Sequence, residues 1–147
     1  YSKLSNYKKQ KYKLQVYGEG ELLNKAKLLA KEIMGCEVYG FEFVENILIN
    51  TNITIIPSIG EESCPISAIE SLCAGKPTFS LPIGGQQEIL KILNNEIDNP
   101  NNIYELLEMA TSLGEEKIVK LSEAASNLYD SNFSLELYRQ NIKSTII

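Results

Sequence analysis

Residues 52–88 read NITIIPSIGEESCPISAIESLCAGKPTFSLPIGGQQE, and this stretch decides the fold. Its first segment, Asn52–Ile56, is apolar and β-branched, which is typical of a strand buried on both faces of a parallel sheet. Pro77–Leu81 predicts a second strand, and a glycine pair then turns the chain into a helix over Gln86–Leu93. The stretch therefore predicts a strand–helix–strand unit followed by a further helix.

The helix between these strands carries its own start and stop signals. Ser63 or Cys64 is expected at the N-cap, and Pro65 suits the first helical position. Gly75 follows the last turn, where a glycine commonly ends a helix.

The flanking sequence repeats the alternation of strands and helices, and it favours one parallel sheet. We expect an α/β fold: a Rossmann-like parallel sheet with helices on both faces, closed by C-terminal helices. Phe41–Ile49 could be strand or helix by periodicity, and its short length between two strands favours a helix. Residues Tyr1–Lys11 are expected to be the tail of a helix that begins upstream. The other predicted elements are strands at Tyr12–Tyr17 and Cys36–Tyr39, helices from Glu21 to near Gly35, Ile103–Leu113, Glu115–Tyr129 and Leu135–Ile146, and a polar loop at Asn94–Asn102.

Composition excludes several kinds of function. The 147 residues suit one domain, and the net charge of −5 gives no basic field for nucleic acid. The chain has no histidine and 3 cysteines, so neither a Ser-His-Asp system nor a zinc site is expected, and no other metal. We expect the cysteines to be small buried apolar residues. The lysines of residues 3–13 could contact phosphate or a membrane, but the solvated face of a helix is the simpler interpretation.

Glu62 and Glu70 are the candidate site residues because of where they stand. Their spacing alone is uninformative, since it recurs elsewhere in the chain. Glu62, however, lies in the loop at the carboxyl end of a buried strand, and Glu70 lies inside the next helix, at the edge where open α/β sheets bind ligands. The backbone N–H groups of Cys64, Ile66 and Ser67 and the helix dipole favour an anion such as a diphosphate. Pro65 would remove one donor from that set.

This arrangement suits a nucleotide sugar, in which phosphates join two hydroxylated ends. A carboxylate on either side of the anion could accept hydrogen bonds from the hydroxyl groups. The alternative is that a glutamate near a helix start simply favours the helix dipole.

Residues 55–90, IIPSIGEESCPISAIESLCAGKPTFSLPIGGQQEIL, resemble the donor-binding core of the family 4 glycosyltransferases, which are retaining enzymes of the GT-B fold. Weaker likeness extends to KLQVYGEGE at 13–21, CEVYGF at 36–41 and ASNLYDSNFSLELYRQNI at 125–142. The matches in the core are Pro57, Ser58, Glu62, Pro65, Glu70, Ala74, Gly75, Pro77, Gly84, Gly85 and Glu88.

The resemblance implies a role for each site residue. Glu62 would hold hydroxyls of the donor sugar and serve as the catalytic residue, and Glu70 would hold the ribose hydroxyls. The N–H groups near Ile66 and Ser67 would meet the diphosphate, and the strand end at Val38–Gly40 would receive the base. Several of the matching residues have a plain structural explanation. The glycines at 75, 84 and 85 and Pro77 are expected to form turns, and Cys73 is expected in the core. Glu88 could serve as no more than a cap of its own helix.

The resemblance also implies what lies outside this chain. The family's lobe begins with a strand, a Gly-Arg turn and a nearby lysine, which this sequence does not contain, and Thr78–Pro82 replaces its usual strand ending in Ser-Asp. We therefore expect residues 1–147 to be a single nucleotide-sugar-binding lobe without its first strand and without the N-terminal acceptor lobe.

The expected function is retaining, metal-independent transfer of a hexosyl unit from a nucleotide diphosphate sugar to a hydroxyl acceptor, with no cofactor. The acceptor, a sugar or a lipid-linked sugar, would be bound mainly by the other lobe. The resemblance implies glycan, lipopolysaccharide or glycolipid assembly in the cytoplasm at the inner face of the membrane, with peripheral membrane association. A GT-B-type sugar-nucleotide epimerase and a non-catalytic nucleotide-binding module remain the alternatives.

Overall fold

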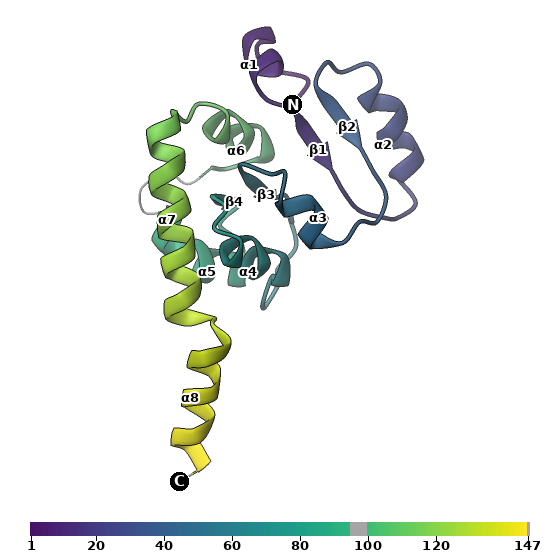
Figure 1. The fold of residues 1–147 in the computed structure, drawn as a ribbon. Helices are drawn as coiled ribbons and strands as arrows, with labels where there is room; N and C mark the ends of the chain where they lie inside the picture. The colour runs from purple at the N-terminus through teal and green to yellow at the C-terminus, as the bar shows by residue number, and fades with distance from the viewer. Residues whose placement is uncertain (95–99, 147) are drawn as a thin grey trace.

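The computed structural model describes residues 1–94 and 100–146, and it confirms an α/β fold of short parallel strands and helices (Figure 1). Its strands and helices follow the predicted order, with most boundaries shifted by a few residues. The elements are α1 (Asn6–Lys11), β1 (Leu14–Val16), α2 (Leu23–Ala30), β2 (Cys36–Val38), α3 (Val44–Leu48), β3 (Thr54–Ile56), α4 (Ile66–Cys73), β4 (Thr78–Ser80), α5 (Gly85–Asn94), α6 (Ile103–Ala110), α7 (Glu115–Asn132) and α8 (Leu135–Ile146).

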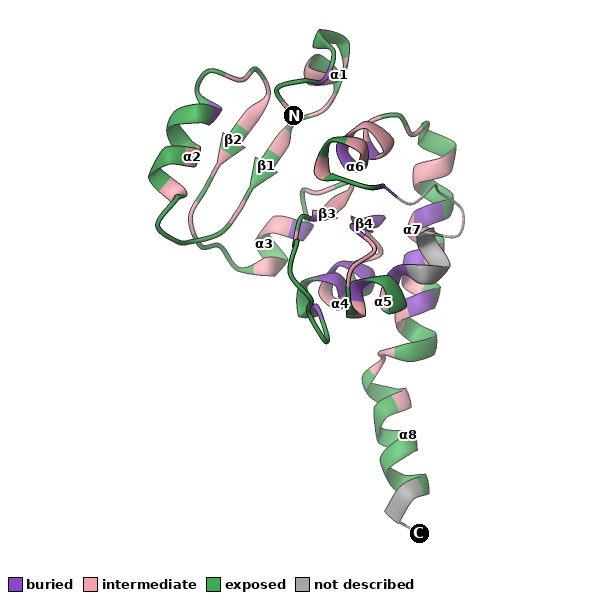
Figure 2. Cartoon of the chain, turned by 180° about the vertical axis from the view of Figure 1, so that it is seen from behind, coloured by how far each residue is buried: buried purple, intermediate pink, exposed green. Residues whose placement is uncertain are grey.

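The strands form two separate two-stranded parallel sheets, in which β1 pairs with β2 and β3 pairs with β4. Val16 stands opposite Val38 in the first pair, and Ile56 stands opposite Ser80 in the second. No strand pairing joins β1 to β3 among the described residues. The expectation of one sheet requires a continuous hydrogen-bond ladder, and the ladder is interrupted at this point. Figures 1 and 2 show the spatial order β2, β1, β3, β4.

The hydrophobic core lies around the second pair of strands, where α4, α5, α6 and α7 meet (Figure 2). β4 is buried along its whole length, whereas β3 is only partly buried at Thr54 and Ile55. Strand β1 is exposed at Gln15 and Val16, so the first pair is covered far less than the second. The core residues are Leu72, Phe79, Leu90, Leu106, Ala110, Leu121, Ala125 and Leu128.

The N-terminal segment forms a complete short helix rather than the tail of a longer one. Ser5 has extended backbone angles, and its side chain accepts a hydrogen bond from the backbone N–H of Lys8, which caps α1. The prediction of a helix running in from upstream is therefore wrong at this position. Lys8 forms an ion pair with Glu108 of α6, so this lysine holds two elements together and is not a freely solvated charge.

Helix α4 begins one residue later than predicted. Pro65, with φ −73° and ψ 97°, is the N-cap, and no side chain caps the helix through Ser63 or Cys64. The proline ring is compatible with this extended conformation, and the ψ angle excludes the residue from the helix itself. Gly75 follows the helix with φ 64°, as expected of a C-terminal glycine.

Other predicted boundaries shift in the same modest way. α2 ends at Ala30 rather than near Gly35, α6 ends at Ala110, and α7 continues to Asn132. Of the predicted loop over residues 94–102, Asn94 belongs to α5 and Asn102 caps α6, while 95–99 lie outside the described residues.

The cysteines are not buried as predicted, because Cys64 and Cys73 are exposed and Cys36 is half-buried. Cys64 lies in the loop before α4, and Cys73 ends that helix on its outward face, so neither position belongs to the core. No described helix is both long and apolar enough to cross a bilayer.

Candidate functional site

The loop between β3 and α4 presents Glu62 at the carboxyl end of the second strand pair. Its carboxylate is exposed, and Oε1 accepts a hydrogen bond from the Ser58 hydroxyl at 3.0 Å. Its backbone carbonyl accepts a second bond from the N–H of Gly85 at 2.7 Å. Glu62 is therefore held from both sides, by its own loop and by the start of α5.

The Gly84–Gly85 pair allows that contact, because the loop passes too close for a side chain. A Cβ at Gly85 would lie 2.2 Å from the carbonyl oxygen of Ser63 and 2.9 Å from that of Glu62. At Gly84 the backbone has φ 56°, a conformation that glycine adopts without strain. The two glycines are turn residues, as expected, and they also set the position of the loop that carries Glu62.

Helix α4 points its free N-terminus at the same region. No acceptor for the backbone N–H of Ile66 or Ser67 is present among the described residues, and both residues are exposed. Because Pro65 is the N-cap and not the first helical residue, its missing N–H removes no donor from this first turn. Two donors and the positive end of the helix dipole therefore remain available to an anion. The exposed Cys64 precedes them.

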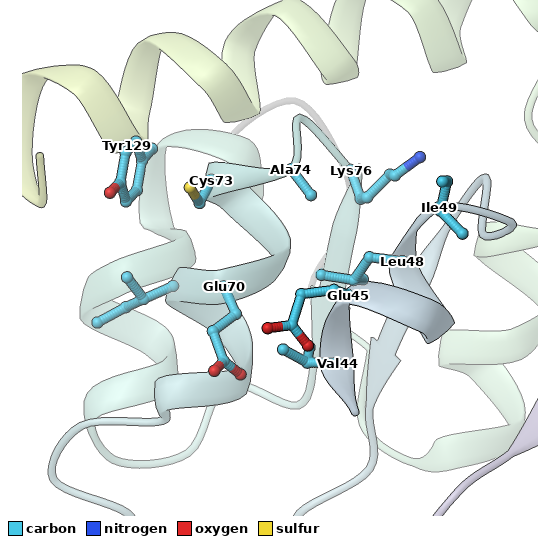
Figure 3. A pocket seen from close by; sticks show the side chains of 10 residues that line it. Val44, Glu45, Leu48, Ile49, Glu70, Cys73, Ala74, Lys76 and Tyr129 are labelled. Atoms are coloured by element: carbon cyan, nitrogen blue, oxygen red, sulfur yellow. The ribbon is translucent and has the colours of Figure 1, made fainter. Parts of the chain in front are cut away.

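Glu70 lines a hollow of about 630 Å³ that we call the α3–α4 hollow. Figure 3 shows Glu70, on α4, and Glu45, on α3, among the side chains that line it. Glu62 does not line this hollow. The lining residues are Val44, Glu45, Leu48, Ile49, Ile69, Glu70, Cys73, Ala74, Lys76 and Tyr129.

Two features of the hollow were not predicted. Glu45 opens α3, just after the carboxyl end of β2, so the rule that ligands bind beyond strand ends could have singled it out. Tyr129 of α7 closes the far side beside Cys73, and the hydrogen bond between phenol and thiol raises the pKa of Tyr129. Cys73 was predicted in the core, and its exposed thiol instead faces this hollow.

The predicted base-binding strand end, Val38–Gly40, belongs to the first strand pair. Val38 lines a separate hollow between α2 and β2 and does not line the α3–α4 hollow. Tyr39 lies between Val38 and Gly40 in the sequence, and its ring stacks on that of Tyr17, with centroids 4.9 Å apart and planes at 13°. The Tyr39 hydroxyl donates to Glu37 at 2.6 Å, which raises the pKa of Tyr39 and lowers the pKa of Glu37. The stack could have been anticipated, since the parallel register places the residues after Val16 and Val38 side by side.

Gln86 is a further residue that sequence reasoning missed. Its side chain is fully buried directly after the glycine pair, and its amide nitrogen and oxygen have no partner among the described residues. A buried amide without hydrogen-bond partners lowers the free energy of unfolding, so Gln86 is a position at which the fold is destabilised. As for metal ligands, no group of three or more Cys, Asp or Glu side chains gathers in the described part of the chain.

Comparison with known proteins assigns the family. The family model described as glycosyl transferases group 1 matches residues 1–128. The chain belongs to the group 1 glycosyltransferases. A solved glycosyltransferase from Rickettsia africae ESF-5 is similar to it, with a TM-score of 0.62 and 20% identity over 96% of this chain.

That similarity, at 20% identity, supports the fold of this group 1 glycosyltransferase and nothing finer. The chain spans 52% of the Rickettsia structure, about half its length. A comparison with curated proteins finds no match.

Proposed function

We propose that this chain is the donor-binding lobe of a retaining, metal-independent GT-B glycosyltransferase of family 4. The longer protein would transfer a hexosyl unit from a nucleotide diphosphate sugar to a hydroxyl group. The observation that carries this proposal is the start of α4, where the free N–H groups of Ile66 and Ser67 lie between Glu62 and Glu70 along the chain. Membership of the glycosyl transferases group 1 family supports transfer of a sugar in general.

Each part of the donor has a candidate partner in this arrangement. The diphosphate would accept hydrogen bonds from the N–H groups of Ile66 and Ser67, with Cys64 beside them, at the positive end of the helix dipole. Glu62 would accept hydrogen bonds from the sugar hydroxyls, and Glu70 from the ribose hydroxyls. The aromatic stack next to Val38 and Gly40 offers a flat surface to the base.

These residues could assist the reaction mainly through charge. As the bond between sugar and phosphate breaks, negative charge grows on the departing diphosphate. Donors that are already oriented stabilise that charge without reorganising during the reaction. Glu62 is oriented by Ser58 and Gly85, so it could hold the sugar in position during the transfer.

The acceptor and the setting are also part of the proposal. A sugar or lipid-linked acceptor would bind mainly to a second lobe of the longer protein, which would contribute to glycan, lipopolysaccharide or glycolipid assembly. We place the reaction in the cytoplasm at the inner face of the membrane, with no cofactor beyond the donor.

Nucleotide binding by residues 1–147 tests the donor half directly. We expect UDP, GDP or ADP to shift the amide NMR signals of Ile66 and Ser67, with weak affinity because the Gly-Arg turn and the nearby lysine that the resemblance implies for the phosphates are not part of this sequence. If none of the three nucleotides moves these signals at millimolar concentration, the assignment of this site is refuted.

Two substitutions in the full-length enzyme separate the roles of the glutamates. Glu70→Ala should weaken nucleotide binding by about 10- to 100-fold, the effect of losing hydrogen bonds to a charged group. Glu62→Gln should lower kcat by a similar factor with little change in KM. Glu61→Gln, an exposed neighbour without a hydrogen-bond partner among the described residues, is the matched control. Unchanged kinetics in both variants would reject these roles, and acceptor-independent epimerisation of the donor would favour the epimerase.

A further inference from the structure

Strand β2 lies at the outer end of the spatial order β2, β1, β3, β4, and its outer backbone edge is unpaired among the described residues (Figures 1 and 2). On the inner edge the N–H of Tyr39 donates to the carbonyl of Val16 at 2.8 Å. Because neighbouring residues of a strand point their backbone groups to opposite edges, the N–H and the carbonyl of Val38 face outward. An edge with free N–H and C=O groups is a template for another strand.

A hollow of about 480 Å³ lies along this edge, and we call it the α2–β2 hollow. It is lined by Lys27, Ala30 and Lys31 at α2 and by residues 36–39 at β2. Side chains alternate between the two faces of a strand, so the half-buried Val38 faces α2 and the exposed Glu37 faces the other side. The Glu37 carboxylate accepts a hydrogen bond from the Tyr39 hydroxyl. The aromatic stack is therefore on the face of β2 that is turned away from α2.

Lys27 and Lys31 give the α2–β2 hollow a positive rim. They stand four residues apart at the end of α2, a spacing that places both on one flank of the helix. Both are exposed, and neither side chain forms an ion pair or a hydrogen bond with another described residue. Two ammonium groups therefore stand beside free backbone groups, and both are available to another molecule.

We propose that the outer edge of β2 binds an extended, acidic segment of a partner protein, which adds to the first strand pair as a further strand. A second backbone supplies both the acceptor for the N–H of Val38 and the donor for its carbonyl. Carboxylates on alternate residues of the segment pair with Lys27 and Lys31. In this mode of binding the main-chain hydrogen bonds supply affinity, and the contacts of alternate side chains supply specificity.

The size of the edge limits the segment. β2 has 3 residues, so the paired part of the partner spans about 10 Å. The inference is independent of the donor roles proposed for Glu62 and Glu70, because those residues belong to the second strand pair and to α4.

Binding of synthetic peptides to the full-length enzyme tests this proposal. The probes are a fluorescein-labelled hexapeptide of alternating glutamate and valine and its counterpart with lysine in place of glutamate. We expect the acidic peptide to bind more tightly in fluorescence polarisation at low salt. In protein with isotope-labelled valine, it should also slow amide exchange of Val38, because it supplies the missing acceptor. Val119, an exposed valine of α7, is the control, and its exchange rate should not change.

Charge reversal at the hollow gives a sharper test. Lys27→Glu combined with Lys31→Glu should weaken binding of the acidic peptide by about 10- to 100-fold at low salt, and the variant should prefer the lysine peptide. Lys3→Glu combined with Lys25→Glu is the matched control. It changes the net charge equally at two exposed lysines that do not line the hollow, so the preference for the acidic peptide should remain.

Four results would overturn the inference. In the first, the acidic peptide does not bind at millimolar concentration. In the second, the control variant weakens binding as much as the variant in the hollow, which would indicate general attraction by charge. In the third, inorganic tripolyphosphate displaces the peptide and the peptide leaves exchange of Val38 unchanged, which would indicate a site for anions alone. In the fourth, Val38 is protected without peptide and dilution removes this protection, which would assign the edge to a second copy of the chain.

Discussion

Replacing Gly85 by alanine would place a methyl carbon 2.2 Å from the carbonyl oxygen of Ser63 and 2.8 Å from its carbonyl carbon. Ordinary van der Waals contact begins at 3.4 Å, so the loop and the start of α5 must separate by about 1 Å. The atoms in the way are backbone atoms, so no flexible side chain can move aside. The separation would also stretch the 2.7 Å hydrogen bond from Gly85 to the carbonyl of Glu62.

The expected cost combines two effects. Overpacking costs about 1–3 kcal/mol, and a lost backbone hydrogen bond about 0.5–1.5 kcal/mol. Urea denaturation should therefore show the free energy of unfolding of Gly85→Ala lowered by about 2–4 kcal/mol. A displacement of about 1 Å at Glu62 should also lower turnover of the full-length enzyme by about 100-fold.

Gly60→Ala is the matched control, because it lies in the same loop and its Cβ would meet nothing within 4 Å. It should leave stability unchanged or raise it by up to about 1 kcal/mol, since alanine has fewer conformations in the unfolded chain. If the free energy of unfolding of Gly85→Ala lies within about 0.5 kcal/mol of the wild-type value, which is the usual effect of a surface substitution, the loop is not held as described.

Two further variants test the packing around the site. Leu72→Ala removes a fully buried side chain from the core and should lower the free energy of unfolding by about 2–5 kcal/mol in urea denaturation, whereas the exposed Leu135→Ala should change it by about 0.5 kcal/mol or less. Lys8→Met breaks the ion pair with Glu108. Lys8 lowers the pKa of Glu108 below its ordinary value of 4.5, so the pair stabilises the fold above that pH and the stabilisation is lost as pH falls through the lowered pKa. Thermal denaturation from pH 7 to 3 should show this loss of stability in the wild type. If Lys8→Met loses the same stability over this pH range, the ion pair with Glu108 is not its source.

Much of the fold could be predicted because local patterns agree with the final structure. The run Asn52–Ile56 contains β3, and the glycine after α4 adopts the left-handed conformation that its position indicates. The break between β1 and β3 could not be predicted, since side-chain patterns show that a segment is a strand but not which strands it pairs with. The sequence also did not reveal that Pro65 is the N-cap of α4. The fixed φ of proline suits both the N-cap and the first helical position, so φ alone does not distinguish them.

The site was predictable mainly where it depends on position along a strand or helix. Glu62 and Glu70 do lie beyond β3 and on α4, but which of them lines the α3–α4 hollow depends on tertiary packing. Their proposed roles stay predictions. The buried amide of Gln86 could not be anticipated either, because glutamine near a helix start usually faces solvent.

The hydrogen bond from Gly85 to Glu62 also bears on how the protein folds. It connects the loop after β3 with the first residue of α5, which follows β4, so a chain that has formed only β3 and α4 lacks this contact to Glu62. Its formation must wait until β4 has paired and α5 has docked, and closing such a non-local contact is slow compared with forming a helix. During refolding, recovery of nucleotide binding should therefore lag behind recovery of helical circular dichroism. Glu62 is therefore oriented late in folding. The chain becomes compact first and becomes able to bind the nucleotide afterwards.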